Sequence, residues 1–150
     1  MAQTSLVAFL LLAGLLVLLL RGQTVADTMQ RSGLPGTWAA DCDQPVSDTA
    51  PRIRYAMRQD GGAVMERLHA DTSRNSTASI TGATVAADGT ITLTIDMATP
   101  KEVRTMSLHK VGNRIRSLSD RIAGAAHYDV RDGRFTRDGS ETPWQTRCEG

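Results

Sequence analysis

Aromatic side chains are scarce in this chain of 150 residues, which has only two tryptophans, two tyrosines and two phenylalanines. A small domain relies on large apolar side chains to fill its core, so this shortage predicts a further source of stability. Cysteine is scarce too: Cys42 and Cys148 are the only two, and they form no Cys-x-x-Cys pair. That absence excludes a dithiol redox motif and a zinc site built from cysteine pairs.

An excess of charge of one sign is also missing, because sixteen acidic residues nearly balance seventeen basic ones. Nucleic-acid-binding proteins and polybasic membrane-surface proteins need a clustered positive excess, so we expect neither class. The chain has no Gly-x-Ser-x-Gly nucleophile elbow and no glycine-rich phosphate loop. The histidines, His69, His109 and His127, fall in three different predicted strands without metal-ligand spacing. We therefore expect no enzyme activity, no cofactor and no bound metal.

A long hydrophobic run is present near the N-terminus. Residues 6–20, from Leu6 to Leu20, are fifteen apolar or glycine positions without a charge. As a helix they would span about 23 Å, which is shorter than a hydrocarbon core of about 30 Å and typical of a signal peptide. Two features disagree with a signal peptide: residues 1–5 carry no lysine or arginine, and Arg21 follows the run.

Residues 1–26 are therefore interpreted as a signal peptide or as an N-terminal membrane anchor, and the sequence leaves both open. The best cleavage position lies after Ala26, before Asp27. Cleavage would give a periplasmic or secreted protein. Retention would anchor it in the inner membrane, facing the periplasm, with residues 6–20 as the membrane contact. Residues 27–35 are interpreted as a linker, and residues 36–150 as one small domain.

Two cysteines in a small exported domain are most simply a disulfide, so we expect a bond between Cys42 and Cys148. Such a bond closes a loop of roughly 100 residues. In the chain-entropy description, a loop of that length is worth up to about 4 to 5 kcal/mol of stability. The disulfide is thus the expected compensation for the shortage of aromatic residues.

The polar part of the chain is rich in strand patterns. The clearest is GTITLTIDM, residues 89–97, in which Ile91, Leu93 and Ile95 alternate with polar residues. RIRYAM, residues 52–57, alternates in the same way around Tyr55. Four Asp-Gly pairs and one Gly-Asn pair separate such runs, which predicts an antiparallel meander.

Two segments fit a helix as well as a strand. In residues 114–127, Ile115, Leu118 and Ile122 are spaced by three and four, as on one face of a helix. Residues 63–70, AVMERLHA, have apolar residues four apart with good helix formers between them. The flanking turns favour strands in both segments.

Counting from Trp38, the chain has about eight predicted strands. A meander of that size avoids exposed edges by closing into a barrel, with its last strand beside its first. The spacing Trp-x-x-x-Cys occurs at both ends, as Trp38 to Cys42 and Trp144 to Cys148. Because alternate residues of a strand share a face, we expect both tryptophans to fill one barrel end. The sequence therefore predicts an all-β, up-and-down barrel, preceded by an N-terminal hydrophobic helix.

GTWAAD, residues 36–41, resembles the opening of the lipocalin and avidin superfamily. The resemblance implies a barrel with a central pocket, in which Trp38 closes one end and an arginine of the last strand, Arg147, packs over it. No second motif of the Thr-Asp-Tyr kind is present, and avidin's extra binding-site tryptophans are missing, which argues against biotin. The Trp-Cys frame at the two ends also resembles small exported proteins of alphaproteobacteria.

Two functions fit these expectations. The first is an exported, non-catalytic binding barrel that holds a small apolar or amphipathic ligand in a pocket lined by Tyr55, Ile91, Leu93, Ile95 and Met106. The second is an accessory subunit, anchored by the retained leader, that docks on a larger membrane or periplasmic protein complex. A barrel this short can also fill its interior with its own side chains and leave no pocket.

Overall fold

The computed structural model describes residues 23–149, which form a closed antiparallel barrel of eight strands in meander order. The predicted hydrophobic helix of the leader lies outside the described residues. The barrel strands are β1 (Gly36–Ala39), β2 (Arg52–Met57), β3 (Ala63–Leu68), β4 (Ser76–Val85), β5 (Ile91–Met97), β6 (Glu102–Val111), β7 (Arg114–Ile122) and β10 (Gln145–Cys148). The all-β, up-and-down prediction is confirmed.

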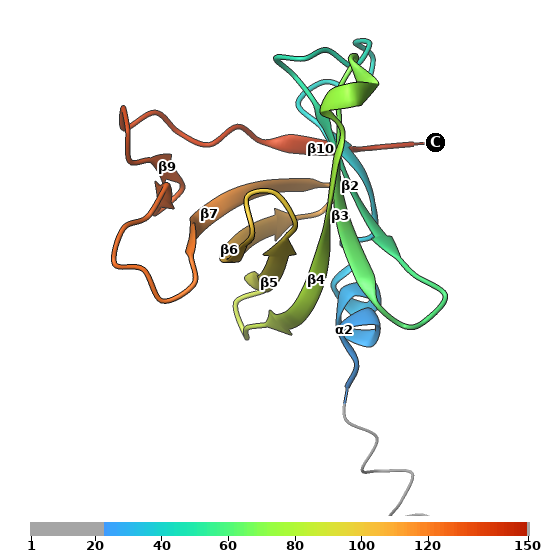
Figure 1. The fold of residues 1–150 in the computed structure, drawn as a ribbon, viewed down its shortest axis with the longest axis vertical. Helices are drawn as coiled ribbons and strands as arrows, with labels where there is room; N and C mark the ends of the chain where they lie inside the picture. The colour runs from blue at the N-terminus through green and yellow to red at the C-terminus, as the bar shows by residue number, and fades with distance from the viewer. Residues whose placement is uncertain (1–22, 150) are drawn as a thin grey trace, which may run out of the picture.

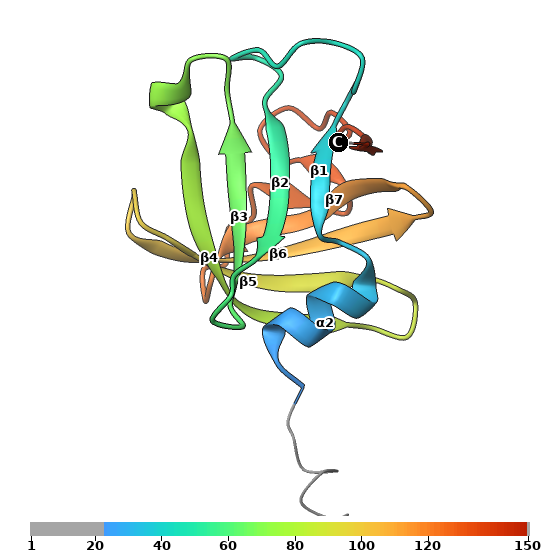
Figure 2. The same cartoon turned by 90° about the vertical axis from the view of Figure 1, so that its right-hand side faces the viewer.

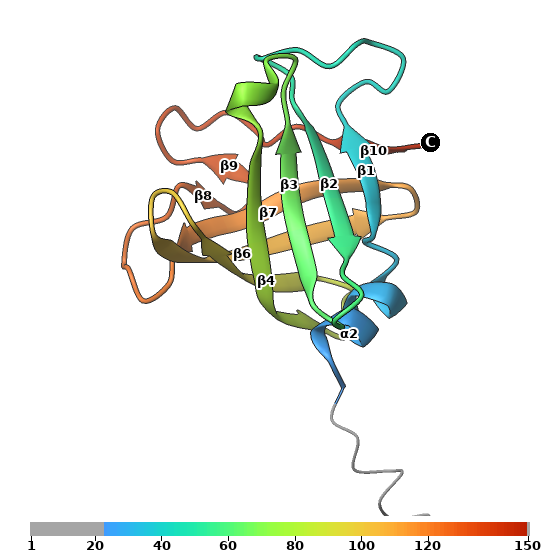
Figure 3. The same ribbon diagram turned by 45° about the vertical axis from the view of Figure 1, so that its right-hand side comes forward.

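The strands form two layers that cross steeply. Figure 3 shows β1 to β4 running up and down in front of β5 to β7. Two short strands, β8 (Val130–Arg131) and β9 (Arg134–Phe135), extend the sheet beyond β7 and lie outside the barrel (Figure 1). A single 3-10 turn, η1 (Thr72–Arg74), joins β3 to β4. Both segments that also fit a helix are strands, as their flanking turns indicate.

The barrel closes through β10, which lies between the first strand and β7. β10 pairs with β1 over three residues, including Trp38 opposite Arg147. Its pairing with β7 is shorter, two residue pairs: Gln145 opposite Ile115 and Thr146 opposite Arg114. The two ends of the domain therefore meet, as the Trp-Cys frame predicts.

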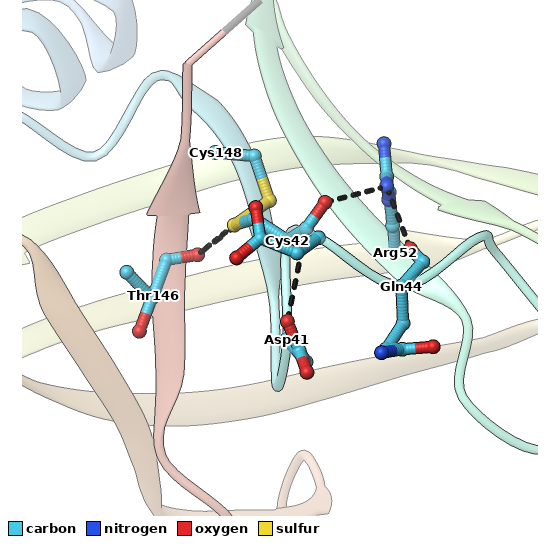
Figure 4. The surroundings of a disulfide bond; sticks show 7 residues. Asp41, Cys42, Gln44, Arg52, Thr146 and Cys148 are labelled. Carbon is cyan, nitrogen blue, oxygen red and sulfur yellow. Dashed lines mark hydrogen bonds between the residues drawn. A yellow bond between two sulfur atoms is a disulfide. The ribbon is translucent and has the colours of Figure 1, made fainter.

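A disulfide joins β10 to the loop that follows β1. Cys42 and Cys148 are bonded, with their Cα atoms 5.3 Å apart and a sequence separation of 106. Figure 4 shows how Arg52 holds the loop after β1, donating from Nη2 to the carbonyl oxygens of Cys42 and Gln44 at 3.1 and 3.0 Å. The disulfide confirms the expected pairing, and it indicates an oxidising, extracytoplasmic compartment.

The segment interpreted as a linker is folded, and that interpretation is wrong. A helix, α2 (Val25–Ser32), covers one end of the barrel (Figure 2). Met29 and Leu34 have no exposed surface and belong to the barrel core. Thr24 and Asp27 cap the helix reciprocally, each side chain bonding the other's backbone N–H at 3.1 Å. The domain therefore begins before residue 27, not at residue 36.

The core is built around that covered end. Trp38 has no exposed surface, and its indole Nε1 donates to the Leu34 carbonyl at 2.9 Å. Ile91, Leu93 and Ile95 belong to the same core cluster and are 0 to 2% exposed. Among residues 23–149, no helix is long and apolar enough to cross a membrane.

Candidate ligand-binding cavity

A cavity of about 200 Å³ lies in the barrel between β2–β3 and β6–β7. Its rim comes from the segment between β7 and β10, which contributes Phe135, Thr142 and Pro143. The apolar lining comes from Ile53, Met65, Met106, Leu108, Ile115 and Val130. The polar lining includes Tyr55, Arg67, Arg116, Ser117, Asp120 and Gln145. The barrel interior is therefore not filled completely, and the hollow part is amphipathic.

Tyr55 is the most deeply buried polar group of the cavity, with 3% of its surface exposed. A buried tyrosine hydroxyl normally has a hydrogen-bond partner. Within residues 23–149, no group bonds the hydroxyl of Tyr55, and the hydroxyl is not one of the fully buried unpaired atoms, so it opens onto the cavity that Tyr55 lines. Burial raises the pKa of Tyr55, with Arg67 lowering it and Asp120 raising it by lesser amounts. Tyr55 is thus a neutral hydroxyl in a lining that also contains Arg67 and Asp120.

Asp120 is the carboxyl group of the cavity lining, and it is already paired. Its Oδ1 accepts from Arg104 Nε at 2.9 Å, and Arg104 also pairs with Glu102 at 2.9 Å and with Asp129. Burial raises the pKa of Asp120, while the hydrogen bond from Arg104 opposes that rise. One guanidinium therefore holds three carboxylates at the edge of the cavity.

Arg67 is the exposed cation at the cavity mouth. Among residues 23–149 it makes no ion pair and no side-chain hydrogen bond. It also lines a second hollow of about 350 Å³ under the loop between β1 and β2. The two hollows share Ile53, Arg67, Pro143 and Gln145, so they are adjacent and Arg67 lies at their junction.

The predicted pocket residues separate into two groups. Tyr55 and Met106 line the cavity. Ile91, Leu93 and Ile95 do not, because they are packed in the solid core, in the same cluster as Met29 of α2. The inward alternation of β5 was predictable, but the sequence could not show which end of the interior is filled.

The residues predicted to close the barrel also differ in position. Trp38 is inside, and the Arg147 guanidinium carbon lies 5.9 Å from the centre of its ring. Arg147 also donates from Nη2 to the Pro35 carbonyl, and its Nε lies 2.9 Å from where a Cβ on Gly36 would be. Glycine at position 36, at φ 141°, leaves room for the arginine.

Trp144 lies outside the barrel wall, contrary to the expectation that both tryptophans fill one end. Its ring is half-buried between Arg114 and Arg116, at 4.8 and 5.1 Å, with His109 beside it. The reason is the strand register: Trp38 is opposite Arg147, so the inward residues of β10 are the odd-numbered ones. Trp144 and Cys148 therefore belong to the outer face.

Arg67 and Asp120 are cavity residues that the sequence reasoning missed. Arg67 continues the inward alternation of Ala63 and Met65 along β3, which was a usable signal. Asp120 gave no such signal, because a β-bulge near Leu118 changes the alternation of β7. Ser117 is opposite inward Leu108 and Asp120 is opposite Met106, so both face the cavity although they are three positions apart, an odd spacing that regular alternation would place on opposite faces.

Comparisons with known proteins add no relative: no family model matches the chain, and neither does a curated protein or a solved structure. The closed eight-strand barrel in meander order is compatible with the calycin-like fold, the fold of the lipocalin and avidin superfamily whose opening motif residues 36–41 resemble. The fold and the cavity are therefore the basis of the functional argument.

Proposed function

We propose that this is an exported, non-catalytic binding protein whose barrel holds a small amphipathic ligand in the cavity beside Tyr55. The observation that carries the proposal is the pairing of an apolar wall with the hydroxyl of Tyr55, which lines the cavity and bonds no described group. Ligand pockets combine these two features, because apolar surface supplies affinity and a few polar groups fix orientation.

The cavity size limits the ligand. At about 30 Å³ for each water, 200 Å³ holds about seven waters. Cavities for drug-sized ligands begin near 300 Å³. We therefore expect a ligand smaller than haem or a long-chain lipid, unless the adjacent hollow of about 350 Å³ is used as well.

The hydroxyl groups of the lining support a non-catalytic role. Thr142 donates from Oγ1 to the Ser117 carbonyl at 2.7 Å, and Ser117 donates from Oγ to the Ser119 carbonyl at 3.4 Å. Nucleophilic catalysis needs a hydroxyl bonded to a general base. Neither hydroxyl has such a base as its acceptor, and the Asp120 carboxylate is bonded to Arg104.

Filling the cavity is the direct test. Ser117→Leu places a larger apolar side chain in the hollow, whereas Ser119→Leu adds the same atoms at a residue that does not line it. We expect Ser117→Leu to abolish ligand-dependent stabilisation in a thermal-shift screen of small amphipathic molecules. A ligand at 100 times its dissociation constant stabilises the wild type and Ser119→Leu by about 2.7 kcal/mol. Equal responses in all three proteins would contradict the proposed site.

A second function, a membrane-anchored accessory subunit, is favoured by the position of α2. Cleavage after Ala26 would remove Thr24, whose side chain caps the helix, and Val25, which packs against the core. The folded domain thus uses residues on both sides of the predicted cleavage position. Retention of residues 1–26 would preserve these contacts and anchor the barrel by its leader.

The cap makes a testable prediction. Protein that begins at Asp27 is expected to be less stable by about 1 to 2 kcal/mol than protein that begins at Gln23, because an N-cap contributes about that much. Thermal unfolding of the two proteins measures the difference. Thr24→Ala in the longer protein should reproduce about 1 kcal/mol of it. The intact mass of the native protein, from soluble and membrane fractions, then shows which form the cell contains.

A further inference from the structure

The charged groups that line the cavity are not equally satisfied. Asp120 accepts a hydrogen bond from Arg104. Arg116 approaches Glu141 at 4.0 Å and stacks on Trp144, but its buried Nε has no hydrogen-bond partner among the described residues. Arg67 has no carboxylate partner within residues 23–149. The charge that the cavity offers to a ligand is therefore positive, and its exposed part, Arg67, lies at the mouth.

The hydroxyl of Tyr55, in the same cavity lining as Arg67, also lacks a hydrogen-bond partner. The hydroxyl of Tyr55 is bonded by no described group, and Arg67 and Asp120 are the charged residues that act on it. Since the Asp120 carboxylate is bonded to Arg104, Tyr55 and Arg67 are left as two donors near one another. An acceptor with negative charge would satisfy both.

We infer that the ligand is a small monocarboxylate, whose carboxylate binds the Arg67 guanidinium and the Tyr55 hydroxyl while its short apolar body packs against Met65 and Met106. This inference rests on the proposed function and specifies its ligand class. A carboxylate matches the planar fork of a guanidinium, and its apolar body matches the remaining lining. A cationic head group is disfavoured, because Arg67 repels it and the available carboxylate is paired.

Methionine methyl NMR of the oxidised protein provides the readout. The chain has six methionines, of which Met65 and Met106 line the cavity and Met29 is fully buried at the end that α2 covers. Hexanoate, 1-hexanol and hexylamine are the matched probes, since they share an alkyl chain and differ in head group. We expect hexanoate to shift the signals of Met65 and Met106, to leave Met29 unchanged, and to bind at least about tenfold more tightly than 1-hexanol.

Three variants identify the groups responsible. Arg67→Gln is expected to remove the preference for hexanoate over 1-hexanol, and Tyr55→Phe to weaken hexanoate binding about threefold to tenfold. Arg54→Gln is the matched control, because Arg54 is an exposed arginine of β2 that pairs with Glu66 outside the cavity. It should bind hexanoate like the wild type. Tyr55→Phe should melt no lower than the wild type, since no protein hydrogen bond is lost.

The outcomes separate the two proposals. Equal shifts of Met65 and Met106 by hexanoate and 1-hexanol, or tighter binding of hexylamine, would overturn the monocarboxylate and leave the binding barrel standing. The same result follows if Arg67→Gln keeps the full preference for hexanoate. Absence of any shift at Met65 and Met106 with all three probes would overturn both proposals for ligands of this size.

Discussion

Removal of the disulfide, by replacing both Cys42 and Cys148 with alanine, is expected to lower the free energy of unfolding by about 4 kcal/mol. The bond spans 106 residues, and closing a loop of about 100 residues is worth close to 4.7 kcal/mol in the chain-entropy description. Small domains are stable by only about 5 to 15 kcal/mol in total. Urea denaturation followed by circular dichroism measures the difference.

Reductant supplies the control for this prediction. It should destabilise the wild-type protein to the level of the Cys42→Ala/Cys148→Ala variant and leave the variant itself unchanged. A wild-type unfolding midpoint that does not respond to complete reduction would show that β1 and β10 hold together without the bond. In that case the few ladder pairs between β10 and its neighbours would be stronger than their number suggests.

Replacing Trp38 with alanine is expected to cost about 4 kcal/mol, whereas replacing Trp144 with alanine should cost about 1 kcal/mol. Trp38 is fully buried and its indole bonds the Leu34 carbonyl, so its removal leaves a large cavity and an unpaired acceptor. Trp144 is half-buried on the outside, where its contacts with Arg114 and Arg116 are each worth about 0.5 to 1 kcal/mol.

The two substitutions are each other's control, because they delete the same side chain from similar sequence frames. Denaturation should be followed by far-ultraviolet circular dichroism, since the fluorescence changes with either substitution. Equal losses for Trp38→Ala and Trp144→Ala would contradict the register that opposes Trp38 to Arg147 and would support two inward tryptophans.

The barrel could be predicted because local patterns determine a meander. Asp-Gly turns mark where the chain reverses, and alternation along residues 91–97 shows which side faces inward. Closure followed from the need to avoid free edges, and the disulfide followed from having two cysteines in an exported domain. None of these arguments depends on the register between neighbouring strands.

The candidate site could be predicted only in part, because it depends on strand register and on β-bulges that interrupt the alternation of inward and outward residues. The bulge in β7 makes Ile115, Leu118 and Ile122 look helical in sequence, and it is the same bulge that turns Asp120 inward. Register placed Trp144 on the outer face. The cap of α2 was missed for another reason: the predicted cleavage position divides Thr24 from Asp27, so the two were not considered together.

The pairing of the first barrel strand with the last has a consequence for the order of events during assembly. β1 has two neighbours, β2 and β10, and about 100 residues separate β1 from β10 in the chain. Until β10 pairs with it, β1 presents an open edge, and Cys42 is a free thiol whose thiolate can attack a disulfide of another molecule and form a mixed disulfide. Correct oxidation therefore comes last, after the whole domain has emerged into the oxidising compartment, and a partner that shields the edge of β1 in the meantime would raise the yield of native protein.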